Sequence, residues 1–143
     1  MPSTDSKKIK IIIADDHPLF RRGLKHAIEE TSDIEVIGES CNGEDLLSLI
    51  RDSKPNIILL DIAMPGKSGL DLLKQLKNEH PKLPILILSV YPEEQYAIRF
   101  LKAGASGYLT KESVAEKLAE AIRKIAGGGK YASTAIIEKL AFD

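Results

Sequence analysis

Residues 9–16 read Ile-Lys-Ile-Ile-Ile-Ala-Asp-Asp, and residues 57–61 read Ile-Ile-Leu-Leu-Asp. Each stretch is a short, nearly continuous run of branched apolar residues that ends in a carboxylate. Such runs are typical of strands that are buried on both faces, because a parallel sheet covered by helices has no face turned to solvent. The two stretches therefore predict parallel strands with acidic groups at their carboxyl ends.

Similar apolar runs recur along the chain, separated by segments whose apolar residues follow helical spacing. This alternation predicts an α/β fold, a doubly wound (βα)5 parallel sheet with right-handed crossovers. The predicted strands are Ile9–Ala14, Ile34–Gly38, Asn56–Leu60, Pro84–Leu88 and Gly107–Thr110. The predicted helices have inward stripes at Phe20, Leu24, Ala27 and Ile28; Leu46, Leu49 and Ile50; Leu70, Leu73 and Leu76; Ala97, Phe100 and Leu101; and Val114, Leu118, Ile122 and Ile125.

Composition narrows the function classes. The 143 residues suit one domain with a short appendage, and the net charge of −1 gives no electrostatic footprint for nucleic acid. No apolar run has the length of a membrane span and the first residues have no signal-peptide character, so we expect a cytoplasmic protein without membrane contact. The single cysteine, Cys41, excludes an internal disulfide, and we expect it to be buried at a strand end.

Polar side chains occupy the carboxyl ends of four predicted strands. Asp15 and Asp16 follow the first strand, Asp61 the third, Ser89 the fourth and Lys111 the fifth. Ligands of open parallel sheets bind outside the carboxyl ends of the strands. If these four strands are neighbours in the sheet, the five side chains converge on one crevice.

Three carboxylates in one crevice repel each other unless a cation lies among them. Mg²⁺ (or Mn²⁺) suits the crevice, because it prefers oxygen ligands and binds through a few carboxylates plus substrate phosphate. A carboxylate can then act as the nucleophile toward a phosphoryl group, while Lys111 neutralises charge and the Ser89 hydroxyl donates to a phosphoryl oxygen. The sequence thus predicts a site for phosphoryl transfer.

The residues at these strand ends resemble a known family. Asp15-Asp16, the stretch Leu-Leu-Asp-Ile-Ala-Met-Pro-Gly at 59–66, Ser89 and Tyr-Leu-Thr-Lys at 108–111 are similar to the motifs of response-regulator receiver domains of bacterial two-component systems. The motifs occur in the family's order, and the resemblance covers roughly residues 8 to 126. It implies a flavodoxin-like sheet with strand order 2-1-3-4-5.

The resemblance also implies roles for the acidic residues. Asp61 is the phospho-acceptor and a histidine kinase is the donor. Asp16 binds Mg²⁺ directly, Asp15 helps through water, Asp61 contributes an oxygen, and the backbone carbonyl of Ala63 completes the protein ligands. Such a protein is a regulator and not an enzyme, apart from self-catalysed phosphotransfer and slow autodephosphorylation.

The remaining motif residues are implied to work as a switch. Lys111 pairs with Asp61 or its phosphate, Ser89 moves toward the phosphoryl group, and Tyr108 turns inward to fill the space left behind. The change reshapes the surface formed by the fourth helix, fifth strand and fifth helix, and homodimerisation on phosphorylation is expected to follow.

Three positions vary within the family. Apolar Ala63 follows the acceptor by two residues and bulky Tyr91 follows Ser89 by two. Neither readily orients an attacking water, which predicts a long-lived phosphorylated state. Many receivers have proline after the lysine, in a cis bond, whereas Glu112 stands here, and we expect a trans bond because a cis bond costs about 3 kcal/mol before other residues.

The chain ends are predicted to lie outside the receiver. Residues 1–7 are expected to be disordered, 8–126 to form the receiver, and 127–143 to form a linker and short helix capped by Ser133. The apolar positions of this helix are Ile136, Ile137, Leu140 and Phe142. Gly-Gly-Lys-Tyr-Ala-Ser at 128–133 and the stretch at 15–24 resemble NarL/FixJ-type regulators, in which a LuxR-like DNA-binding output domain follows. A terminal helix that packs on its own domain is the alternative.

Other functions fit the motifs less well. A phosphatase of the haloacid dehalogenase class has a second aspartate where Ala63 stands. A flavin binder needs a phosphate loop after the first strand, where Asp15 and Asp16 repel phosphate. A protein-binding module that is not phosphorylated remains open but leaves the acidic crevice without a role. His17 follows the acidic pair, and we interpret it as a loop or first-turn residue and not as a metal ligand.

Overall fold

The computed structural model describes residues 8–142, and its centre is one parallel sheet of five strands in the order β2-β1-β3-β4-β5. This confirms the predicted fold class and the strand order. The disorder expected for residues 1–7 concerns a segment outside the described residues. The strands are β1 (Ile9–Ala14), β2 (Ile34–Ser40), β3 (Ile57–Asp61), β4 (Ile85–Ser89) and β5 (Gly107–Thr110).

Three strands extend farther toward their carboxyl ends than the apolar runs predicted. β2 includes Ser40, and β3 and β4 each include the polar residue that follows the apolar run. Asp61 lies opposite Leu88, and Ser89 lies opposite Thr110, so both polar residues take part in the ladder of their strands. The backbone of Asp61 and Ser89 is therefore part of the sheet itself.

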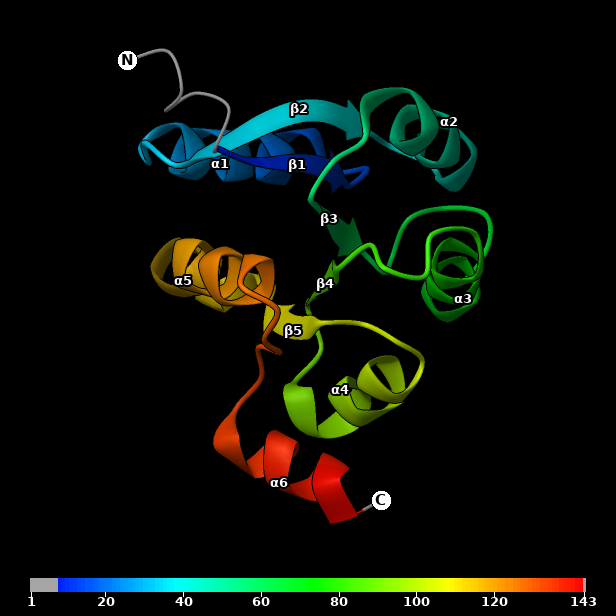
Figure 1. Ribbon diagram of the computed structural model, residues 1–143, viewed down its shortest axis with the longest axis vertical. Coiled ribbons are helices and arrows are strands. Elements are labelled where there is room, and N and C mark those ends of the chain that lie inside the picture. The colour runs from blue at the N-terminus through cyan, green and yellow to red at the C-terminus, as the bar shows by residue number, and fades with distance from the viewer. Residues whose placement is uncertain (1–7, 143) are drawn as a thin grey trace.

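Helices cover both faces of the sheet. In Figure 1, α1 (Pro18–Glu29) and α5 (Val114–Ala126) lie on one face, and α2 (Gly43–Ser53), α3 (Gly69–Glu79) and α4 (Glu93–Lys102) lie on the other. A short 3₁₀ turn, η2 (Lys111–Ser113), joins β5 to α5, and α6 (Thr134–Phe142) follows at the end of the described chain.

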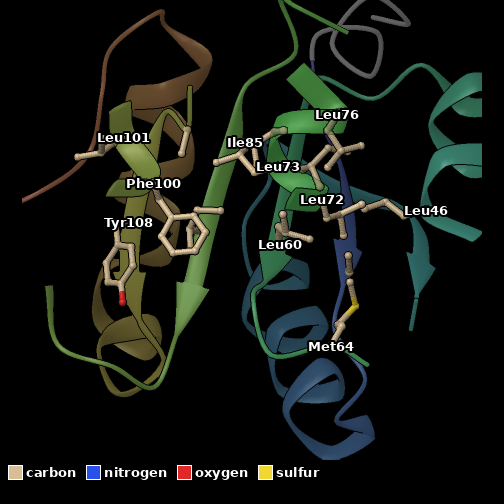
Figure 2. Packing of buried hydrophobic residues seen from close by; sticks show 14 of the residues in the cluster. Leu46, Leu60, Met64, Leu72, Leu73, Leu76, Ile85, Phe100, Leu101 and Tyr108 are labelled. Atoms are coloured by element: carbon tan, nitrogen blue, oxygen red, sulfur yellow. The ribbon is translucent and has the colours of Figure 1, made fainter. Parts of the chain in front are cut away.

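Two hydrophobic cores fill the space between the sheet and its helices. Alternate residues of each strand point to opposite faces, so Ile11 and Ile13 pack toward α1 and α5, while Ile12 packs toward α2, α3 and α4. Figure 2 shows part of the second core, where Leu46, Leu72 and other leucines meet Leu60 of the sheet. Side chains buried on both faces explain why the strands carry few polar residues.

Local signals set the ends of the helices. The Asn42 side chain accepts a hydrogen bond from the Asp45 N–H at the start of α2, and Ser68 does the same for Asp71 at α3. α1 begins at Pro18, directly after Asp16 and His17, because proline is favoured in the first turn. The acidic pair is thereby held between a central strand and a fixed helix start.

The segment after α5 runs along the edge strand of the sheet. Tyr131 N–H donates to Ser106 O and Tyr131 O accepts from Tyr108 N–H, at 2.9 and 3.0 Å, which adds a short parallel bridge to β5. α6 then lies beside α4 (Figure 1). Ile136 is buried and Leu140 is partly buried there, whereas Ile137 and Phe142 are exposed.

One prediction about the chain is wrong. Cys41 is exposed, because it lies in the turn after β2, and the residue buried at that strand end is Ser40. Among residues 8–142, no helix combines the length and the apolar character that crossing a bilayer requires.

Candidate functional site

The end of β1 places two carboxylates at the centre of the sheet edge. Asp15 is fully buried, and its Oδ1 accepts the His17 backbone N–H at 2.7 Å. Its backbone is fixed as well, because Asp15 N–H donates to Ser40 O and Asp15 O accepts from the Arg21 guanidinium. Asp16 points into the same crevice and keeps 28% of its side chain exposed. The site thus has a closed floor and an open mouth.

Asp61 faces these carboxylates from the neighbouring strand β3 and is 1% exposed. Its Oδ1 accepts the Ala63 N–H at 3.0 Å, and its Oδ2 accepts a hydrogen bond from Lys111 Nζ at 3.2 Å. Lys111 Nζ also lies 3.4 Å from Asp15 Oδ2. One ammonium group therefore serves two buried carboxylates.

The carboxylates have more acceptor capacity than the protein satisfies. Asp15 Oδ2 and Asp16 Oδ1 are buried atoms without a hydrogen-bond partner. Buried polar atoms of this kind are uncommon and often mark the place of an ion or ligand. The crevice holds three carboxylates and one ammonium, so it keeps a net negative charge. Its oxygen donors therefore fit a hard divalent cation such as Mg²⁺.

His17 is the residue that the sequence interpretation set aside. It does lie just before α1, as expected of a loop residue, but its Nδ1 is 3.4, 3.3 and 3.5 Å from oxygens of Asp15, Asp16 and Asp61. Its side chain is 59% exposed, at the mouth of the crevice. The signal available in the sequence was its position directly before Pro18, which fixes the start of the helix next to the strand end.

Lys111 is also supported from the side of α1. Its Nζ lies 4.5 Å from the centroid of the Phe20 ring, within the range of a cation–π contact. Phe20, with the exposed side chains of Leu19 and Val90, lines an apolar groove of about 820 Å³ that begins beside His17. The mouth of the acidic crevice therefore opens onto an apolar surface.

Ser89, at the end of β4, and Tyr108, in β5, form a second group around Tyr91, which lies in the loop between β4 and α4. Ser89 Oγ accepts the Tyr91 N–H at 2.9 Å, and the Tyr108 hydroxyl donates to Tyr91 O at 2.8 Å. Tyr108 is 1% exposed and its ring already points inward, next to Phe100 (Figure 2). Burial raises the pKa of the Tyr108 phenol, which keeps it protonated as a donor.

The structure thus brings most of the predicted site together. Asp15, Asp16, Asp61 and Lys111 meet in one crevice, and Ala63 adjoins it through its N–H. No cis peptide bond occurs within residues 8–142, so the bond between Lys111 and Glu112 is trans as predicted.

Comparison with known proteins gives one consistent family. The family model described as "Response regulator receiver domain" matches residues 11–123. Response regulator GacA of Pseudomonas aeruginosa is 35% identical over 133 residues, which cover 93% of this chain and 62% of GacA. Transcriptional regulatory protein DegU of Brevibacillus brevis is 39% identical over 127 residues, 89% of this chain and 54% of DegU.

A solved structure agrees with the sequence relatives. A two-component response regulator of the LuxR family from Aurantimonas sp. SI85-9A1 superposes with a TM-score of 0.85 at 30% identity, over 94% of this chain and 96% of that one. The chain spans somewhat more than half the length of the curated relatives it matches. These similarities confirm the resemblance predicted from the strand-end motifs, including its LuxR-type branch.

Proposed function

We propose, from the premise that this chain belongs to the response regulator receiver domain family, that Asp61 accepts a phosphoryl group from a histidine kinase. The observation that carries the proposal is the environment of Asp61. Its carboxylate is buried beside two further carboxylates and is hydrogen-bonded by Lys111 at 3.2 Å. A purely structural aspartate has no need of such surroundings.

The chemistry is a displacement at phosphorus. An oxygen of Asp61 attacks the phosphorus of a phosphohistidine, the O–P bond forms as the N–P bond breaks, and the leaving imidazole takes up a proton. Lys111 already lies at the nucleophile, so its charge stabilises the added phosphoryl oxygens without a large movement. The Ala63 N–H holds the other carboxylate oxygen and fixes the direction of attack.

A Mg²⁺ ion, when bound, would supply positive charge that offsets the charge of the carboxylates and of the transferred phosphoryl group. Asp15, Asp16 and Asp61 are the side chains that would hold it, with the carbonyl of Ala63 as a further ligand. Mn²⁺ prefers the same oxygen donors and is expected to replace it. The partnerless oxygens of Asp15 and Asp16 support this assignment.

Ser89 and Tyr108 are proposed to couple phosphorylation of Asp61 to a conformational change at the start of α4. Both hold Tyr91, one through its N–H and the other through its carbonyl. If the Ser89 hydroxyl turns to a phosphoryl oxygen, Tyr91 loses one hydrogen bond and the start of α4 is released. The population then shifts toward the arrangement that the phosphoryl group binds better.

The receiver is proposed to be the regulatory part of a longer cytoplasmic transcription regulator. The relatives extend well beyond the matched region, and one of them is named a transcriptional regulatory protein. DNA contact would then belong to an output domain that follows residues 127–143, and phosphorylation would favour a homodimer. Ala63 and Tyr91 lack a group that orients water toward the phosphoryl, so autodephosphorylation is expected to be slow.

Intact-mass measurement tests the proposal. With acetyl phosphate and Mg²⁺, the wild-type protein should gain one phosphoryl group, and the gain should disappear in Asp61→Asn. Asp71→Asn is the matched control, because Asp71 is an exposed aspartate at the start of α3. Continuous phosphate release without an adduct would favour a hydrolase instead, and an adduct that survives Asp61→Asn would refute the assigned acceptor.

A further inference from the structure

We propose that Arg21 of α1 is a positioning residue for the acidic crevice. Its guanidinium fixes the peptide between Asp15 and Asp16 and thereby sets the direction in which the Asp16 carboxylate enters the crevice. Arg21 itself touches neither the cation nor the phosphoryl group. This role rests on the proposed function, because it concerns the binding of the Mg²⁺ ion on which phosphoryl transfer depends.

Asp16 differs from the other two carboxylates of the crevice. Asp15 Oδ1 accepts the His17 backbone N–H at 2.7 Å, and Asp61 Oδ1 accepts the Ala63 N–H at 3.0 Å. In the described part of the chain, Asp16 Oδ1 is buried without a hydrogen-bond partner. The His17 ring lies 3.3 Å from that oxygen, but the ring is 59% exposed. The direction of the Asp16 side chain therefore depends on the backbone that carries it.

Arg21 holds that backbone from the side of α1. Its guanidinium donates to the carbonyl oxygen of Asp15. Because a peptide unit is planar, a bond to this oxygen also fixes the positions of the Asp16 nitrogen and Cα. On the other side, the Asp15 N–H donates to Ser40 O of β2 at 2.9 Å. The backbone of the acidic pair is thus tied to a helix and to a neighbouring strand.

Arg21 is itself held in place by its neighbours. Its Nε donates to Glu39 Oε1 at 2.9 Å, and Lys25 Nζ lies 3.0 Å from Glu39 Oε2. Its backbone N–H donates to His17 O at 2.9 Å in the first turn of α1. The planar guanidinium can donate to Glu39 and to the Asp15 carbonyl at once, from a rigid fork that a lysine ammonium does not offer.

Two plainer roles for Arg21 make different predictions. If Arg21 acted on the crevice by charge alone, its removal would strengthen Mg²⁺ binding, because a positive charge near the site repels the cation. If it only stabilised the contact between α1 and β2, its removal would loosen the fold as a whole. Positioning instead predicts weaker Mg²⁺ binding and a local loosening at the acidic pair, and lysine should repair neither.

Calorimetric titration with Mg²⁺ tests the first part. Wild type is compared with Arg21→Met, Arg21→Lys and the control Arg22→Met, which removes a positive charge from an exposed position of the same helix. Both Arg21 variants should bind Mg²⁺ about tenfold more weakly, and the control should stay within about twofold of wild type. Unchanged or tighter binding in Arg21→Met, wild-type affinity in Arg21→Lys, or an equal loss in Arg22→Met would overturn the proposal.

Amide hydrogen exchange of the metal-free protein tests the second part. The His17 N–H, which donates to Asp15 Oδ1, should exchange about tenfold faster in both Arg21 variants, because the turn has lost a hydrogen bond. The amide of Ile12, in the buried centre of β1, should keep its rate. Equal acceleration at both amides, or none at His17, would refute positioning. Phosphorylation by acetyl phosphate is measured separately, so a wild type that binds Mg²⁺ but gains no phosphoryl group would contradict the proposed function and not the role of Arg21.

Discussion

Charged side chains are arranged differently at the two ends of the strands, which are called here the carboxyl edge and the amino edge of the sheet. At the carboxyl edge, Asp15 and Asp61 are buried, share one ammonium and leave an oxygen without a partner. At the amino edge, Asp33 receives two hydrogen bonds from the Arg123 guanidinium, at 2.8 and 3.0 Å, and both side chains are about half exposed. One edge carries unsatisfied buried charge and the other carries satisfied surface charge.

The difference shows that the charges at the carboxyl edge are suited to binding a cation, whereas those at the amino edge contribute only a little to stability. Desolvated carboxylates held close together oppose folding until a cation compensates them, so a fold keeps them where they bind something. An exposed ion pair gains little, because water already solvates both groups. Variants at the two edges should therefore respond differently to metal.

Lys111→Met should have the largest effect. Without the Lys111 ammonium, Asp15 and Asp61 lose the cationic partner that they share, and the free energy of unfolding should fall by about 3 kcal/mol in metal-free buffer. Urea denaturation with and without Mg²⁺ measures the change, and Mg²⁺ should restore part of it. The comparison fails if Arg123→Met at the amino edge costs as much, or if Mg²⁺ restores nothing.

Asp15→Asn should stabilise the metal-free protein, whereas Lys111→Met destabilises it. Removing one buried charge relieves the repulsion in the crevice, so the metal-free protein should gain about 1–2 kcal/mol in free energy of unfolding. The same variant should lose most of the stabilisation that Mg²⁺ gives wild type, because tight binding to the folded state raises stability by mass action. Thermal denaturation at several Mg²⁺ concentrations checks both, and a metal-free loss of stability would contradict the repulsion argument.

Phe20→Leu should have a smaller effect on the same crevice. Leucine keeps an apolar side chain between α1 and the sheet but removes the aromatic face under Lys111, which is worth about 0.5–1 kcal/mol. The rate of phosphorylation by acetyl phosphate should fall a few-fold, and Phe20→Tyr should restore it. Equal rates for the leucine and tyrosine variants would show that the ring face does not hold Lys111.

Arg123→Gln should have the smallest effect, confined to the amino edge. The hydrogen bonds from Arg123 lower the pKa of Asp33 below its ordinary value of 3.8, so the variant should move that pKa back up. The pair's contribution to stability is therefore present above pH 3.8 and is lost as the pH falls through the lowered pKa of Asp33. An NMR titration of the Asp33 carboxyl measures the shift, and an unchanged pKa would contradict the assigned cause.

Much of the fold could be predicted because it depends on local patterns. The apolar runs located all five strands, and the apolar stripes located the five helices that alternate with them. The carboxyl ends of the strands were predicted less well. Asp61 and Ser89 are polar, so the apolar runs stop before them, but both residues pair within the sheet. Cys41 was placed wrongly, since its apolar character says nothing about which side of a turn it occupies.

The candidate site was predicted as a set of residue types and not as a set of contacts. Strand-end positions identified Asp15, Asp61 and Lys111, but no spacing rule reveals that one ammonium lies between two of these carboxylates. His17 was passed over for the same reason. Its distance to Asp61 depends on two strands that are separated by more than forty residues in sequence and adjacent in the sheet.

The order of residues along the chain determined a buried parallel sheet, its crossing helices and the acidic groups at the strand ends, because burial and turn chemistry act over a few neighbours. Only the folded molecule decided which carboxylate oxygens lack a hydrogen-bond partner, that the Lys111 ammonium pairs with two of the carboxylates, and that the His17 imidazole lies near all three. Those outcomes depend on distances of about 3 Å between atoms of separate elements, since hydrogen bonding and metal coordination weaken steeply beyond that range.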